Sequence, residues 1–117
     1  MRPRILIIDD HVGFRRVARA ILHSEGFEVV GEAGDGGDAL AAVARLRPEI
    51  VLLDIHLPDV DGFEVAHRIA AMSSPPVVVL ISSRPIADLR RQVADSPVAG
   101  FIAKHELSGP AVAALAG

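Results

Sequence analysis

Short aliphatic runs alternate along the chain with longer stretches in which apolar residues recur every three or four positions. Five runs are predicted to be strands, the second less strongly because Gly31 interrupts it, and the third is typical of a strand buried on both faces. They occupy residues 4–8, 28–33, 50–54, 77–81 and 98–103. The third run has four aliphatic residues and ends on Asp54, after which Pro58 prevents the strand from continuing.

The stretches between these runs have the periodicity of amphipathic helices. We predict helices from His11 to about Gly26, over 38–47, after Asp61, over 85–95 and over 107–116. Asp10, Asp61 and either Ser108 or Gly109 are the expected caps, with Pro110 in the last helix's first turn. The expected inner faces of the first two helices are Phe14, Val17, Ala18, Ile21 and Leu22, and Leu40, Val43, Ala44 and Leu46.

Strands that alternate with helices five times predict an α/β fold with a parallel sheet covered on both faces. Right-handed crossovers leave few topologies, and we predict a doubly wound five-stranded sheet in the order 2-1-3-4-5, with five helices. A different strand order on the same plan is the alternative. The length suits a single domain, 1–117.

Composition narrows the classes of function. Cysteine is absent, which excludes disulfides and thiolate metal sites and fits a cytoplasmic location. No apolar run approaches the roughly 20 residues that span a bilayer, so no membrane contact is expected. A net charge of −3 gives no electrostatic reason to expect nucleic-acid binding. Of the twelve basic residues, only Lys104 is lysine, which suggests a position that requires a compact ammonium group.

Polar side chains follow four of the five predicted strands. Asp9 and Asp10 end the first, Asp54 the third, Ser82 the fourth, and Lys104 the fifth. The carboxyl ends of parallel strands share one edge of the sheet, so these side chains can converge on one site. Taken singly each has a simpler interpretation, such as a helix cap for Asp10, but the combination favours a site.

The chemistry of that combination points to phosphoryl transfer. Three neighbouring carboxylates repel unless a cation lies among them, and oxygen ligands favour a hard ion such as Mg²⁺. A carboxylate beside Mg²⁺ can attack a phosphoryl group and form an acyl phosphate. We choose Asp54 as the nucleophile because it is central, with Lys104 and Ser82 as donors to the phosphoryl oxygens and Asp9 and Asp10 as metal ligands.

These residues resemble the receiver domains of bacterial two-component response regulators, which have the CheY-like, flavodoxin-like fold. The resemblance covers nearly the whole chain. It rests on Asp9-Asp10-His11, on the stretch from Leu53 to Gly62, on Ser82, and on the stretch from Gly100 to Lys104. The Asp-Asp-His opening and the Val-Val-Gly-Glu-Ala stretch look most like receivers of LuxR/NarL-like regulators.

The resemblance implies that a sensor histidine kinase or phosphotransfer protein phosphorylates Asp54. Mg²⁺ would be held by Asp9, Asp10, Asp54 and the backbone carbonyl of His56. Ser82 and Phe101 would form the switch pair, and the face of the fourth helix, fifth strand and fifth helix would change for a downstream output protein or domain. Such a chain is a signalling phosphoacceptor rather than an enzyme, with only weak self-phosphorylation and self-dephosphorylation. Homodimers are common in the family, but no exposed stripe here indicates one.

Some positions depart from the family pattern. His105 stands where the family usually has proline, often in a cis peptide, so we expect a trans bond or a different loop shape here. We expect His56 to be exposed, and His11, His23, His67 and His105 to lie on helix surfaces rather than bind ligands.

Two other functions remain open. A pseudo-receiver would fold alike but act without phosphorylation, which usually accompanies loss of the acids or the lysine. A phosphatase or phosphotransferase of the haloacid-dehalogenase type would usually have a second Asp where this chain has His56. The chain ends one short helix after Lys104, which slightly favours a stand-alone receiver over one cut from a DNA-binding regulator.

Overall fold

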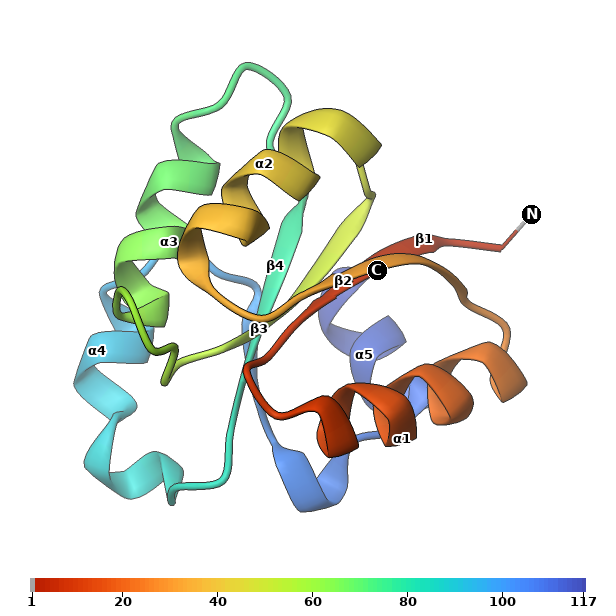
Figure 1. Ribbon diagram of the computed structural model, residues 1–117. Coiled ribbons are helices and arrows are strands. Elements are labelled where there is room, and N and C mark those ends of the chain that lie inside the picture. Colours follow the sequence, from red (N-terminus) through yellow and green to blue (C-terminus); the bar gives the residue numbers. More distant parts are fainter. Residues whose placement is uncertain (1) are drawn as a thin grey trace.

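Five parallel strands form one sheet in the computed structural model, which describes residues 2–117 (Figure 1). The strands are β1 (Arg4–Ile8), β2 (Glu28–Ala33), β3 (Ile50–Asp54), β4 (Val77–Ser82) and β5 (Gly100–Ala103). Their order is β2-β1-β3-β4-β5, and every neighbouring pair is parallel. The predicted fold class and strand order are therefore confirmed.

Helices cover both faces of the sheet. They are α1 (Val12–Ser24), α2 (Gly36–Leu46), α3 (Gly62–Ala70), α4 (Arg90–Ala94) and α5 (Gly109–Ala116). In Figure 1, α1 and α5 lie on one face, and α2, α3 and α4 lie on the other. Among residues 2–117, none of these helices is long and apolar enough to cross a membrane.

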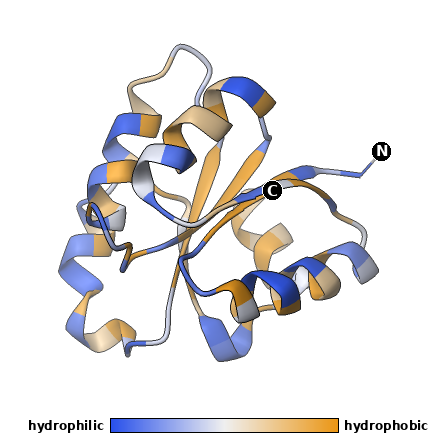
Figure 2. Ribbon diagram, viewed as in Figure 1, coloured by the Kyte–Doolittle hydropathy of each residue, from blue (hydrophilic) through white to orange (hydrophobic). Residues whose placement is uncertain are grey.

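Alternation along each strand divides the apolar side chains between two cores. In β1, Leu6 and Ile8 face α2 and α3, whereas Ile5 and Ile7 face α1 and α5. The side chains of the other central strands also alternate between the two cores. Both faces of these strands are therefore buried, so nearly every residue in them is apolar. Figure 2 shows the hydrophobic strands between helices whose outer surfaces are largely hydrophilic.

Three of the predicted helix signals are confirmed. The Asp61 carboxylate accepts a hydrogen bond from the Phe63 backbone and caps α3. The Ser108 hydroxyl caps α5 in the same way, with Pro110 in its first turn. Gly26 follows the end of α1 with a positive φ of 99°, a conformation that glycine adopts without steric cost.

The predicted cap of α1 and start of α2 are wrong. His11, not Asp10, is the extended N-cap residue of α1, and no side chain caps that helix. Asp35 caps α2 through the Asp38 N–H, so that helix begins at Gly36 inside the predicted loop. The cap formed by the Asp35 carboxylate favours the helix by more than the low helix propensity of Gly36 and Gly37 disfavours it.

Two residues predicted to face inward are exposed. Val17 on α1 has a relative exposure of 55%, and Ala44 on α2 also faces solvent. The buried face of α2 is instead formed by Ala39 and Ala42, together with Val43. Alanine carries little periodic signal, so the pattern did not fix the rotation of this helix.

The segment after β4 is broken rather than one helix over 85–95. A single 3₁₀ turn (Ile86–Asp88) precedes α4, and Leu89 between them has a non-helical φ of −125°. Only Leu89 and Val93 pack on the core, which is too little to hold a long helix. The strand predicted over 98–103 begins only at Gly100, and the last helix begins at Gly109 rather than Leu107.

Candidate functional site

Four of the five strands place a polar or charged residue at the same edge of the sheet. Asp9 follows β1, Asp54 ends β3, Ser82 ends β4 and Lys104 follows β5. Asp54 pairs in register with Ile81, the residue before Ser82. Among residues 2–117, three polar or charged residues are buried, namely Asp9, Asp54 and Ser82, and all lie at this edge.

Lys104 joins the two buried carboxylates. Its Nζ lies 2.7 Å from Asp9 Oδ2 and 3.4 Å from Asp54 Oδ2. It also lies 4.8 Å from the centre of the Phe14 ring, whose face attracts a cation. Partial burial alone would lower the pKa of Lys104, but the bonds and charges of Asp9 and Asp54 outweigh it and raise the pKa. The ammonium group is therefore held in its charged form.

Asp54 is buried in a way that makes its negative charge costly. Burial raises the pKa of this carboxyl group above its ordinary value, and the nearby charge of Asp9 adds to the rise. The His56 backbone N–H, which donates to Asp54 Oδ1 over 3.1 Å, and the Lys104 ammonium act in the opposite direction. A further cation at this edge would therefore be favourable.

Asp10 and His11 complete the cluster from the start of α1. The His11 Nδ1 atom lies 3.2 Å from Asp9 Oδ1 and 3.1 Å from Asp10 Oδ1. One ligand atom each from Asp9, Asp10, His11 and Asp54 falls within 4.8 Å of the others. His11 is exposed, as predicted for a surface residue, but its ring nitrogen faces the acids, which that prediction missed. Its place directly after two strand-end acids was the available signal.

The chain after Asp54 is fixed by backbone contacts. His56 and Asp61 form an isolated antiparallel bridge, and the Gly62 N–H donates to the Ile55 carbonyl over 2.8 Å. This tight loop keeps the His56 backbone beside the Asp54 carboxylate, where the predicted carbonyl ligand would be needed. His56 itself is exposed, as predicted.

Asp59 attaches this loop to a second element, a contact that sequence reasoning missed. Its two carboxylate oxygens accept from the Gly36 and Gly37 N–H groups at the start of α2, over 2.8 and 3.0 Å. These bonds, the Gly36 bond first, lower the pKa of Asp59. A charged acceptor thus ties the loop that follows Asp54 to a helix N-terminus.

The predicted switch pair lies on the same edge and the adjoining face. The Ser82 hydroxyl is fully buried and accepts from the Arg84 N–H over 3.0 Å. Phe101 is half-buried on β5, opposite Leu80 of β4. The peptide bond before His105 is trans, as expected, and no cis bond occurs in residues 2–117.

The donor atoms fit a hard divalent cation. Asp9 Oδ2 is fully buried and, its ion pair with Lys104 aside, has no hydrogen-bond partner among the described residues. Three carboxylates from two strand ends gather around the single ammonium group of Lys104, so negative charge remains in excess. Oxygen atoms in this number leave room for the waters and phosphate oxygens that Mg²⁺ keeps around itself.

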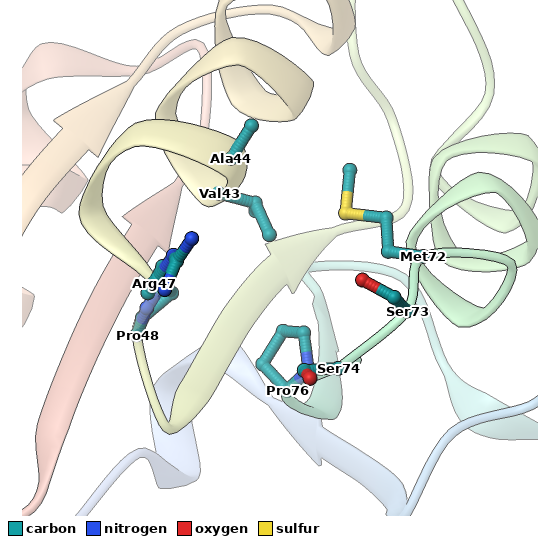
Figure 3. A pocket seen from close by; sticks show the side chains of 8 residues that line it. All are labelled: Val43, Ala44, Arg47, Pro48, Met72, Ser73, Ser74 and Pro76. Carbon is teal, nitrogen blue, oxygen red and sulfur yellow. The ribbon is translucent and has the colours of Figure 1, made fainter.

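A separate hollow lies at the opposite end of the sheet. It has a volume of about 530 Å³ and lies between the end of α2 and the start of β4 (Figure 3). The residues that line it are Val43, Ala44, Arg47, Pro48, Met72, Ser73, Ser74 and Pro76. None of them is a carboxylate, so this hollow takes no part in the acidic site.

Comparison with known proteins gives a consistent result. The family model of the response regulator receiver domain matches residues 5–114. The chain is 39% identical over 106 residues to the virulence factors transcription regulator BvgA of Bordetella pertussis, covering 91% of this chain and 51% of BvgA. It is 39% identical over 89 residues to the DNA-binding response regulator MtrA of Mycolicibacterium paratuberculosis, covering 76% of this chain and 39% of MtrA. The chain therefore spans about half or less of these relatives.

Solved structures agree with the sequence matches. The signal receiver domain of the response regulator NarL from Mycobacterium tuberculosis superposes with a TM-score of 0.86 at 34% identity, over 98% of this chain and 96% of that one. A LuxR-family two-component response regulator from Aurantimonas sp. SI85-9A1 gives a TM-score of 0.88 at 25% identity, over 100% and 87%. The fold, the acidic edge and these matches together show that the chain belongs to the response regulator receiver domain family of two-component signalling.

Proposed function

We propose that Asp54 is the phosphoacceptor of this receiver domain and takes its phosphoryl group from a sensor histidine kinase or phosphotransfer protein. The observation that carries the proposal is the position of its carboxylate. It is buried at the end of the central strand, 3.4 Å from the Lys104 ammonium and within the cluster of acids. Burying the charge of a carboxylate costs stability, so a carboxylate held in this way beside a cation is typical of a functional group and is well placed to act as a nucleophile.

In the proposed step, an Asp54 oxygen forms a bond to the phosphorus atom of a phosphohistidine. The P–N bond breaks, and its electron pair stays on the imidazole nitrogen of the donor, which then takes a proton. The product is an acyl phosphate on Asp54. Lys104 is already held charged beside the reacting carboxylate, so it can bind a phosphoryl oxygen without reorganising.

The acidic residues would serve a magnesium ion. We propose that Asp9, Asp10, Asp54 and the backbone carbonyl of His56 hold it, because these residues offer oxygen donors and their ligand atoms lie close together. A bound Mg²⁺ would neutralise charge on the phosphoryl oxygens. The tight loop from Ile55 to Gly62, with Asp59 tied to α2, would keep the His56 backbone in place.

Ser82 and Phe101 would transmit the change. The Ser82 hydroxyl now accepts from the Arg84 backbone, and it would instead donate to a phosphoryl oxygen. That movement would open space for the Phe101 ring, and the face of α4, β5 and α5 would change with it. A hollow of about 720 Å³ on this face is lined by Phe101, Ile86 and Leu115 among others, which leaves room for such repacking.

The wider role follows the family. Residues 1–117 would act as one receiver unit that reports to an output protein or domain, without touching nucleic acid itself. Cytoplasmic location and homodimer formation stay predictions from the sequence. Of the alternatives, a pseudo-receiver is disfavoured because the acids and Lys104 are not only present but assembled. Phosphoryl turnover by the isolated chain would be weak, as the resemblance to receiver domains implies.

Intact mass after incubation with acetyl phosphate tests the proposal. The wild type should gain one phosphoryl group in Mg²⁺ and none in excess chelator. Asp54→Asn should gain none, whereas Asp95→Asn, which changes an exposed acid at the end of α4, should behave as the wild type. A gain that persists in Asp54→Asn would contradict the assignment.

A further inference from the structure

His11 places an imidazole nitrogen against the acidic cluster. Its Nδ1 atom lies 3.1–3.2 Å from one oxygen each of Asp9 and Asp10. The side chain is 68% exposed, so its ring is free to approach an ion from the solvent side. The proposed metal set of three carboxylates and one carbonyl does not use this nitrogen.

The spacing of these atoms matches that of neighbouring ligands on one metal. In an octahedral site with metal–ligand distances of about 2.1 Å, adjacent ligand atoms lie about 3.0 Å apart. The two distances from Nδ1 to the acids are close to that edge length. One ligand atom each of Asp9, Asp10, His11 and Asp54 lies within 4.8 Å of the others, which is close enough for one ion to be shared. The ring nitrogen therefore lies where a ligand of an ion shared with these acids would lie.

We propose that His11 is a direct ligand for transition-metal cations such as Ni²⁺, Co²⁺ or Zn²⁺ at the acidic site, so that this receiver prefers them to Mg²⁺. This inference rests on the proposed metal site. Imidazole nitrogen suits these borderline ions, whereas Mg²⁺ prefers oxygen and keeps its waters. The same site would thus hold Mg²⁺ through oxygens alone and a transition metal through oxygens plus Nδ1.

A simpler role for His11 would leave selectivity unchanged. A ring N–H at Nδ1 could donate to Asp9 and Asp10 and only orient them. In that role the ring would support every divalent cation alike, because it would act through the carboxylates. The two roles therefore differ in the ratio of nickel to magnesium affinity, not in either affinity alone.

The test is isothermal titration calorimetry of the folded protein with Ni²⁺ and with Mg²⁺. His11→Gln removes the imidazole but keeps a polar side chain with an amide oxygen. His23→Gln, an exposed histidine further along α1, is the matched control for nickel bound elsewhere. Electron spin-echo spectroscopy with Cu²⁺ as a probe gives a second readout, since a ligated imidazole has a characteristic nitrogen modulation.

The wild type should bind Ni²⁺ at least about tenfold more tightly than Mg²⁺, and excess Mg²⁺ should compete. His11→Gln should weaken Ni²⁺ binding by roughly tenfold or more, the scale expected for disturbing a metal ligand, and Mg²⁺ binding by less than about threefold. It should also lose the nitrogen modulation, and His23→Gln should change neither. Nickel binding unchanged in His11→Gln, or a loss equal for both ions, would overturn the inference. If Mg²⁺-dependent phosphorylation persisted, the phosphoacceptor proposal would still stand.

Discussion

A substitution at Gly62 tests how closely the loop that follows Asp54 packs against the end of β3. A Cβ atom at this buried position would collide with the Asp54 carbonyl oxygen and would lie 2.7 Å from Ile55 Cα. Both obstacles are backbone atoms, so no side chain can rotate away to make space. Gly62→Ala must therefore displace the loop that carries His56 or the end of β3.

The magnitude follows from the rigidity of those neighbours. Overpacking a buried site costs typically 1–3 kcal/mol, and contact with backbone atoms that cannot rotate away places this change near the upper end, about 3 kcal/mol. With a urea m value of about 1.5 kcal/mol per molar, the unfolding midpoint should fall by roughly 2 M. Mg²⁺ affinity should fall as well, because the same loop supplies the proposed His56 carbonyl.

Gly13 provides the matched control. It also lies in the first turn of a helix, α1, but an added Cβ would meet no atom within 4 Å. Gly13→Ala should raise stability by up to about 1 kcal/mol, because alanine is the better helix former. Urea unfolding followed by circular dichroism measures both variants. A Gly62→Ala midpoint within about 0.3 M of the wild type would refute the reasoning.

Three further changes probe charges at and around the site. Burial raises the pKa of Asp54, so its ionised form destabilises the metal-free protein. Asp54→Asn should therefore raise the melting temperature at pH 7, and the gain should shrink as pH falls through that raised pKa. Partial burial raises the pKa of Glu32, but the Arg19 and Arg15 guanidinium groups outweigh it and lower the pKa below its ordinary 4.5. Glu32→Gln should thus cost about 0.5–1 kcal/mol above pH 4.5, and the cost should vanish as pH falls through the lowered pKa; a constant cost in a pH series of melts would argue against the ion pair. Asp59→Ala should weaken Mg²⁺ binding more than Asp59→Asn, because the amide keeps one acceptor for α2; calorimetry that ranks the two alike would remove the role given to this contact.

The fold was largely predictable because its central strands are apolar on both faces. Residues 50–53 have no polar position to face water, which a sheet covered on both faces satisfies. The predicted helix faces were less accurate where small residues carry them. Ala39 and Ala42 are buried and Ala44 is exposed, yet the three side chains are identical, so only packing against the sheet decides between them.

The site was predictable as far as strand ends determine it. Asp9, Asp54 and Lys104 meet because parallel strands end at one edge, and this rule needs no side-chain geometry. His11 was not predicted to face the acids, since a residue at the start of a helix can point to solvent or to the site. Asp59 was missed because its partners at Gly36 and Gly37 are remote in sequence and are backbone groups.

The central claim is that Asp54 carries the phosphoryl group, and chemical trapping tests it most directly. After reaction with acetyl phosphate and Mg²⁺, borohydride reduces an aspartyl phosphate to homoserine, which peptide mass spectrometry can locate in the chain. The account predicts homoserine at position 54 alone, with the yield dependent on Mg²⁺. Homoserine at Asp9 or Asp10, or none in folded protein that had gained a phosphoryl group, would contradict it.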